Sequence, residues 1–362
     1  MAVATLAADF AYGNTRLRAR KGEFLGAAEY ERLLGKDVDG VLGALAETPY
    51  APDVEATLAR HHGAPALNDA VRRHLARTLE EMRSFYAGPA RELVDVLLSR
   101  FDVGNLLALL RAKAGGTPPE DALLALVPLG WAEDALAREI LRQHELPGAV
   151  ELIVRWLPDA EQGRVVRAAF AEYERTEDLA SLEHALIADH CRRAVERVES
   201  AGAGGETLLE YLRREIDEQN LLTVLRLRAD LEDRRQDASA HADALPGGSV
   251  EPAALADAAR LPGRDAVAAR LVELGRESWR EPLERWAASG DLVLLERELG
   301  RALAAGAVRL FLDGDPLAID VPLAYTVAKQ TEARNMRLVA ESAVRGRDAG
   351  DVRAELVQAG AA

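Results

Sequence analysis

The chain has 362 residues, of which 49% are hydrophobic and 29% charged, and its formal net charge is −15 at pH 7. This composition excludes a disordered chain, and the negative charge disfavours binding to nucleic acid or to an anionic lipid surface. Alanine, leucine, arginine and glutamate dominate, whereas aromatic residues make up only 5%. Because those four residues are strong helix formers, we predict an all-α protein.

The sequence also bears on the compartment. The single cysteine, Cys191, excludes an intramolecular disulfide and fits a reducing environment. Residues 1–25 lack the basic segment and apolar core of a secretory signal. No stretch approaches the roughly 18–20 uncharged apolar residues that a transmembrane helix requires. We therefore expect a cytoplasmic protein that inserts no segment into lipid and reaches a membrane only through another protein.

The densest basic run is "TRLRARK", residues 15–21, in an otherwise acidic chain. On a helix, Arg16 and Arg20 share a face with Tyr12, because residues four apart lie above one another. The run either contacts an acidic partner or pairs with the chain's own carboxylates. Both interpretations stay open at this point, and the three residues are candidate partner contacts.

Helical segments follow in chain order. Short apolar helices broken by proline are expected over 37–50, 119–141 and 251–275. Amphipathic helices are expected over 179–198 and 292–308, where apolar residues recur at helical spacing. Few β-branched runs compete with the helix-forming residues.

Two breaks divide the chain. The segment 114–121, "AGGTPPED", ends a helix with glycines and cannot continue through two prolines. The segment 231–252 is polar and bears glycine and proline, which is typical of a linker. We therefore predict three helical repeat domains over residues 1–115, 116–230 and 231–362, the last with a C-terminal tail.

An internal repeat supports this division. Asn105, Asn220 and Asn335 are each 115 residues apart and stand in similar segments. An acid precedes each asparagine by three residues: Asp102, Asp217 and Glu332. Apolar rows run back from the asparagines in steps of four: Leu93, Leu97 and Phe101; Leu208, Leu212 and Ile216; and Leu323 and Val327, weakening at Thr331. Each asparagine thus ends an apolar helix face and is expected to be at least partly buried.

The repeated polar positions allow two interpretations. They form either a contact with a partner or substrate that is displayed three times, or a buried polar clasp. A buried amide is costly unless it is hydrogen-bonded, so we favour the clasp, which would bond a backbone group and fix how two helices cross. Arg111 and Arg226 follow their asparagines by six residues, whereas the third repeat has Glu341 there. Both arginines flank the apolar face and are candidate partner contacts.

No motif for catalysis stands out. The chain lacks a phosphate-binding loop of the form G-x-x-x-x-G-K-[ST] and a glycine turn between strand and helix. His184 and Cys191 can share a helix face, but a metal site needs three or four converging ligands. We predict no catalytic residue, no cofactor and no metal site.

Four segments resemble one known family. They are "DFAYGNTRLRARKGEFL", "RFDVGNLLALLRAKAGG", "LEYLRREIDEQNLLTVLRLRAD" and "VPLAYTVAKQTEARNMRLVA". In order and spacing they are similar to the C subunits of bacterial and archaeal V-type (A-type) ATPase/ATP synthases, whose eukaryotic relative is the d subunit of the vacuolar ATPase. The likeness runs over nearly the whole chain.

The resemblance implies a non-catalytic rotor subunit with three similar helical domains in a pseudo-threefold, funnel-like arrangement. Such a protein is a socket between the central axle, formed by the D and F subunits, and the membrane proteolipid ring. One copy per complex carries torque for ATP-linked proton or sodium transport, at the inner face of the cell membrane. Two other classes remain: a generic helical scaffold or adaptor, and an α-helical enzyme with a site at the domain junctions.

Overall fold

The computed structural model describes residues 2–131, 133–201, 204–234 and 244–357. Every regular element in these ranges is a helix, so the predicted all-α class is confirmed for the described residues. The chain forms two compact units, one of residues 1–186 with 307–362 and one of residues 187–306. The predicted division into three repeat domains stays a prediction.

The larger unit begins with a long helix and a series of shorter ones. Its elements are α1 (Ala2–Ala19), the 3₁₀ helix η1 (Arg20–Glu23), α2 (Ala27–Leu33), α3 (Val38–Leu45), α4 (Ala51–Leu58), α5 (Ala64–Ser84), α6 (Gly88–Ala114), α7 (Pro119–Leu124), α8 (Asp134–Arg142), α9 (Leu146–Trp156), α10 (Ala160–Thr176) and the first part of α11 (Leu179–Ala201). The end of α16 (Leu292–Asp313), then α17 (Asp320–Arg345) and α18 (Ala349–Glu355), complete it.

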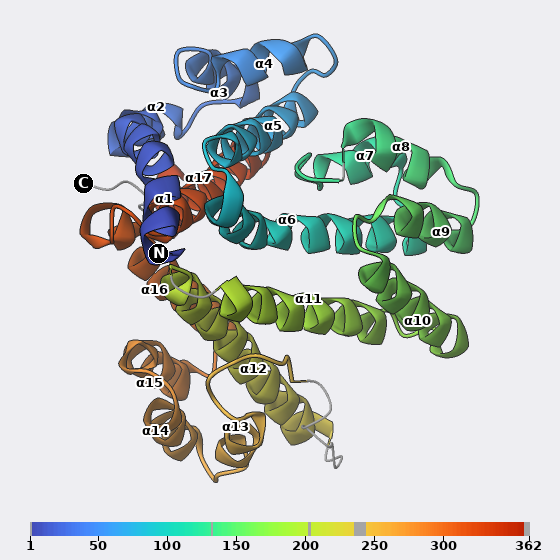
Figure 1. Ribbon diagram of the computed structural model, residues 1–362, viewed down its shortest axis with the longest axis vertical. Coiled ribbons are helices and arrows are strands. Elements are labelled where there is room, and N and C mark those ends of the chain that lie inside the picture. The colour runs from blue at the N-terminus through green and yellow to red at the C-terminus, as the bar shows by residue number, and fades with distance from the viewer. Residues whose placement is uncertain (1, 132, 202–203, 235–243, 358–362) are drawn as a thin grey trace. The chain divides into compact units, whose positions relative to one another are not determined.

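Two long helices organise this unit. α17, from the end of the chain, packs against α1, α3 and α5 from its beginning, whereas α6 packs against the α7, α8 and α9 helices that follow it (Figure 1). α17 is buried along most of its length, which accounts for its many apolar and small residues. The α6 helix ends where the glycines predict, since Gly115 is its C-cap and Gly116 has a φ of 66°.

The smaller unit contains the rest of α11, then α12 (Glu206–Arg234), α13 (Pro252–Ala259), α14 (Arg264–Leu274), the 3₁₀ helix η2 (Glu277–Trp279), α15 (Arg280–Ser289) and most of α16. Its core joins α12 to the short helices through Leu221, Leu255, Trp279 and Trp286. The α12 helix continues to Arg234, so the first four residues of the predicted linker 231–252 are helical instead, and residues 235–243 lie outside the described part.

The three apolar rows predicted from the repeat are confirmed. All nine side chains are buried, including Thr331, where the apolar pattern weakens. The Thr331 hydroxyl donates to the Val327 backbone carbonyl at 2.8 Å, which satisfies a polar group inside the row. A helical threonine can therefore stand where the other two repeats have an aromatic or aliphatic residue.

Candidate functional site

Each repeated asparagine forms the same pair of hydrogen bonds. The Asn105 amide donates to the Val127 carbonyl at 2.7 Å and accepts from the Val127 N–H at 2.9 Å. Asn220 does the same with Leu245, at 2.9 and 2.7 Å, and Asn335 with Val357, at 2.7 and 3.0 Å. The three amides are at most 3% exposed. We call these contacts the asparagine clasps; each fastens the backbone of the segment that follows its own helix.

The acid before the asparagine reaches the same segment in two of the repeats. Asp217 accepts from the backbone N–H groups of Ser249 and Val250, at 2.8 and 3.0 Å. A Cβ atom on Gly248 would lie 2.3 Å from Asp217 Oδ1, so a larger residue there would collide with the acid. Asp102 stands in the same relation to Gly130, with the same 2.3 Å approach. Glycine permits this close packing of loop against carboxylate.

Burial governs the ionisation of these two acids. It raises the pKa of Asp102 to about 6, against the opposing effect of a hydrogen bond from the Trp131 backbone. Burial likewise raises the pKa of Asp217, although the Val250 and Ser249 amides act in the opposite direction. The neighbouring Glu218 is buried as well, and its pKa is raised to about 8. Arg83 and Arg276, whose charges act on Asp102 and Asp217, pair instead with Asp95 and Glu210.

The third acid, Glu332, lies in a different environment. Its Oε2 atom accepts from the Leu25 N–H at 2.8 Å, and its Oε1 atom accepts from the Tyr50 hydroxyl at 3.0 Å and from Lys329 Nζ at 3.0 Å. Lys329 and Glu332 are each 1% exposed. The acid of the third repeat is thus bound by a backbone amide of the N-terminal segment, whereas the acids of the other two repeats contact the loop that follows their own helix.

Lys329 and Glu332 belong to a larger group, the α17 charge cluster, which we define as Lys329, Glu332, His74, Asp53 and Tyr50. His74 Nδ1 lies 3.0 Å from Asp53 Oδ2, and its Nε2 lies 3.4 Å from Lys329 Nζ. The His74 ring stacks on Tyr50 with centroids 3.7 Å apart. Apart from Tyr50, which directly precedes α4, these groups come from α4, α5 and α17, so the cluster joins the start of the chain to its end.

The ionisation states in the cluster follow from burial and neighbours. Burial lowers the pKa of His74, and the nearby Lys329 acts in the same direction. Burial would raise the pKa of Asp53, but hydrogen bonds with His74 and Arg77 outweigh it and hold this pKa below its usual value. The arrangement therefore contains a neutral His74 imidazole between the ionised Asp53 carboxylate and the Lys329 side chain. Since each member is buried and bonded, we assign the cluster to holding the fold.

A second charged group joins α5 to α8. Asp69, completely buried, accepts from Arg72 and Arg73, and both arginines also bind Asp134 at the start of α8. Arg72 is only 2% exposed and binds Asp134 through two nitrogens, at 2.9 and 3.2 Å. Such two-pronged contacts fix both position and orientation.

Three of the five candidate partner contacts are arginines that pair with a carboxylate of this chain, and the other two, Tyr12 and Arg16, contact each other. Arg111 pairs with Glu183 through two nitrogens, and Arg226 pairs with Glu296 at 2.6 Å. Arg20 pairs with Glu81. Arg16 instead contacts Tyr12 and Phe85, and the Tyr12 side chain is 61% exposed. Whether any of them touches a partner stays a prediction.

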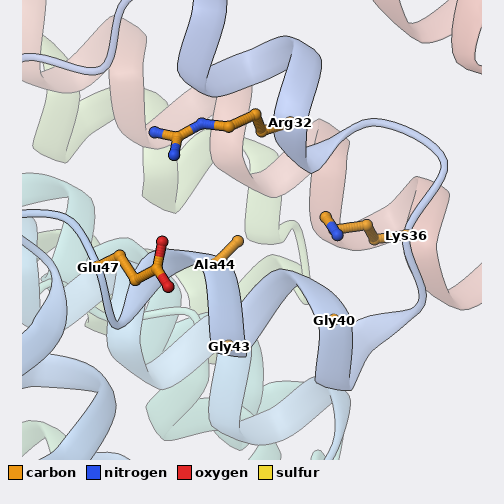
Figure 2. Close-up of a pocket in the computed structure, with 6 residues that line it drawn as sticks. All are labelled: Arg32, Lys36, Gly40, Gly43, Ala44 and Glu47. Atoms are coloured by element: carbon orange, nitrogen blue, oxygen red, sulfur yellow. The ribbon is translucent and has the colours of Figure 1, made fainter.

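An open depression lies between α2 and α3. Figure 2 shows the residues that line it: Arg32 on α2, Lys36 in the following loop, Gly40, Gly43 and Ala44 on α3, and Glu47 just beyond α3. It shares no residue with the α17 charge cluster or the asparagine clasps.

Sequence reasoning missed most of the α17 charge cluster. Lys329 and Glu332 are three apart on a helix, which is the spacing of an ordinary surface ion pair. Asp53 and His74 lie in other helices with no shared pattern. The available signal was weak, because α17 carries other charged residues besides Lys329 and Glu332.

Among the residues that the structure describes, no helix is both long enough and apolar enough to span a bilayer. In the same described ranges, no three His, Cys, Asp or Glu side chains are grouped as metal ligands would be.

Comparison with known proteins identifies the family. The family model described as "ATP synthase (C/AC39) subunit" matches residues 13–355. The chain therefore belongs to the C/AC39 family of ATP synthase subunits. Among its relatives is the C subunit of the V-type ATP synthase of Thermus thermophilus, 32% identical over 97% of this chain and 99% of the relative. The C subunits of the A-type ATP synthases of Halorubrum lacusprofundi and Methanosarcina mazei are 26% and 23% identical, covering 96% and 94% of this chain and 97% and 90% of the relatives.

Family membership gives the repeats and clusters a context. As a subunit of a V/A-type ATPase, the chain works within an assembly of several proteins. The asparagine clasps and the α17 charge cluster lie within the matched range, apart from Val357, which follows it by two residues. They are features of a C/AC39 chain, not of an added segment.

Proposed function

We propose that this chain is the non-catalytic C subunit of the rotor, a socket that couples the central axle, formed by the D and F subunits, to the membrane proteolipid ring. The observation that carries the proposal is the family match over residues 13–355, together with relatives named as C subunits that align along nearly their whole length. In this role the chain transmits torque for ATP-linked transport of protons or sodium ions. It sits on the inner face of the membrane, held there by the ring, with one copy per complex.

The internal construction suits a mechanical part. A body that transmits torque has to resist shear, and buried, fully bonded polar networks make a fold rigid. The asparagine clasps fasten a loop to each of three long helices, and the α17 charge cluster fastens the ends of the larger unit together. The proposal includes three similar domains around a pseudo-threefold axis, with a funnel that receives the axle.

The test uses purified components. The chain is mixed with the D–F axle subcomplex and, separately, with the detergent-solubilised proteolipid ring, and binding is followed by co-sedimentation. We expect association with both and no ATP turnover by the chain alone. ATP hydrolysis by the isolated chain, or absence of association with both axle and ring, would overturn the proposal.

Coupling gives a second readout. In an assembly rebuilt without this chain, we expect the catalytic head to hydrolyse ATP while ion transport into vesicles is lost, and adding the chain back to restore transport. Transport at the full rate without the chain would show that another protein joins the axle to the ring.

A further inference from the structure

A pre-arranged cationic and aromatic group lies at the exposed face of α1 and the end of α5. The Arg16 guanidinium lies 4.4 Å from the centroid of the Phe85 ring and 5.5 Å from that of Tyr12, and one of its nitrogens donates to the Tyr12 hydroxyl at 2.6 Å. Arg20 lies over the same Phe85 ring at 5.1 Å. We call Tyr12, Arg16 and Phe85 the α1 stack.

The α1 stack differs from the other candidate contacts in its charge balance. Arg20, Arg111 and Arg226 each have a carboxylate of this chain within ion-pair distance. Arg16 has ring and hydroxyl contacts but no carboxylate within that distance in the described part of the chain. It acts on Glu81 only from further away, and Glu81 is already paired with Arg20. Its charge is therefore held in place without a partner of its own.

The residue types are those of an interface centre. Tyrosine and arginine are enriched among the residues that dominate binding energy, because they offer a large rigid surface and directed hydrogen bonds. Aromatic residues make up only 5% of this chain, and the Tyr12 side chain is one that is largely exposed, at 61%. An arginine already stacked on two rings loses little side-chain freedom when it binds a carboxylate with two N–H groups.

From these observations we infer that the α1 stack is a docking site for an acidic helix or loop of another protein of the ATP synthase. A carboxylate of that protein pairs with Arg16, and an apolar or aromatic neighbour covers Tyr12. Opposite charge between this basic run and the partner selects the site, since most of this chain, with its net charge of −15, would repel an acidic surface. The inference requires only that the chain assembles with other subunits, and it holds whether the partner belongs to the axle, the ring or the stator.

The first experiment places a photo-reactive benzophenone side chain at position 12 of the chain in the assembled complex. We expect irradiation to link it to another protein of the complex, at a segment rich in aspartate or glutamate, as identified by mass spectrometry. Linkage to a segment without carboxylates, linkage to lipid, or no linkage at all would overturn the inference.

The second experiment reverses the charge. Arg16→Glu should lower the affinity of the chain for the complex lacking it by at least tenfold, and the remaining binding should depend less on salt than that of the unaltered chain. Arg16→Lys keeps the charge but loses the stacking and the two-pronged contact, and should show an intermediate loss. Thermal melting of each variant separates lost binding from lost folding.

Arg142→Glu is the matched control. Arg142 is also an exposed helical arginine, at the end of α8, with no ion pair or ring contact among the described residues. The same charge change there should leave assembly unaltered. If Arg16→Glu, melting normally, assembles as well as Arg142→Glu does, the stack is not a docking site. Binding of the chain to vesicles of phosphatidylcholine and phosphatidylglycerol, abolished by Arg16→Glu, would assign the stack to lipid and equally overturn the inference.

Discussion

The α6 and α17 helices each carry an acid three residues before an asparagine, yet the two acids, Asp102 and Glu332, have opposite surroundings. Asp102 on α6 faces a glycine and a backbone amide, and burial raises its pKa to about 6. Glu332 on α17 is bonded to Lys329, Tyr50 and the Leu25 amide. The asparagines, by contrast, make the same pair of contacts. The repeat therefore determines what the asparagine binds, whereas the helices packed around each copy determine what the acid binds.

The largest expected effect comes from breaking the ion pair of α17. Lys329→Met leaves Glu332 buried without its cation, and should destabilise the larger unit by about 3–5 kcal/mol. Chemical denaturation measures the loss, and hydrogen exchange assigns it to α5 and α17. Adding Glu332→Gln should recover part of the stability, because it removes the uncompensated charge.

Lys36→Met serves as the control for this prediction. Lys36 is exposed, so the same change there should alter the free energy of unfolding by less than about 0.5 kcal/mol. Equal losses in the two variants, or no loss in Lys329→Met, would show that the α17 charge cluster contributes no stability through its ion pair.

The asparagine clasps come next. Asn105→Leu, Asn220→Leu and Asn335→Leu each remove two hydrogen bonds and leave a backbone N–H and carbonyl without partners, at a cost of about 2–4 kcal/mol. Asn335→Leu should cost most, since Asn335 also donates to the Tyr30 hydroxyl at 3.3 Å. Hydrogen exchange of the Val127, Leu245 and Val357 amides should rise in the matching variant only.

Replacement of Asn105 by aspartate tests the two hydrogen bonds of the clasp separately. Asn105→Asp as a carboxylate still accepts from the Val127 N–H but places a buried charge against the Val127 carbonyl. It should therefore cost more stability at pH 8 than at pH 4, where the protonated carboxyl can donate to that carbonyl. An Asn105→Leu chain that is fully stable, yet fails to join the complex, would show that the asparagine belongs to a binding surface.

The asparagine clasps could be predicted from the sequence only in part. Helix-forming residues and step-of-four rows were enough to predict the class and the buried ridge that ends at each asparagine. The even spacing was enough to pick out the asparagines, because an amide on an apolar face needs a bonded partner. The identity of that partner, a backbone 22 or 25 residues further on, depends on how the chain turns back after the helix.

The α17 charge cluster could not be predicted for a different reason. Its members are separated by 255 residues between His74 and Lys329, and no local pattern connects them. Burial of a lysine and a glutamate is normally avoided, so the pair on α17 resembles a solvated one until α4, α5 and the N-terminal segment are placed around it.

Replacing the two acids, Asp102 and Glu332, should change the free energy of unfolding in opposite directions. The pKa of Asp102 in the folded state, about 6, lies above its unfolded value near 4, so the folded chain keeps a proton that the unfolded chain releases. Its contribution to stability is present below about pH 4 and is lost as the pH rises to about 6. Asp102→Asn removes this loss and should stabilise the larger unit at pH 8 by about 1–2 kcal/mol.

Glu332→Gln is the comparison. It removes the partner of Lys329 and should destabilise the chain at pH 8. Denaturation midpoints at pH 4 and pH 8 test both variants, and the gain from Asp102→Asn should disappear at pH 4. If the two changes had the same sign at pH 8, the contrast between α6 and α17 would be wrong.

The smallest effect concerns the glycine beside the first clasp. Gly104 is exposed within α6, and a Cβ atom there would meet no atom within 4 Å. Gly104→Ala should raise stability by up to about 1 kcal/mol, because alanine loses less backbone freedom in a helix. Gly130→Ala should do the reverse, since Gly130 has a φ of 68° and its Cβ would lie 2.3 Å from Asp102 Oδ1. Melting temperatures compare the two variants.

Assembly of the Gly104→Ala chain tests the exposed side of α6 in the same way. If the variant stabilises the isolated chain but weakens its retention in the complex, the glycine makes room for a partner protein at the exposed face of α6. If the variant and the unaltered chain are retained equally well, Gly104 contacts no partner. The residues of this repeat would then be constrained by the inner face of α6, where Asn105 and Asp102 lie.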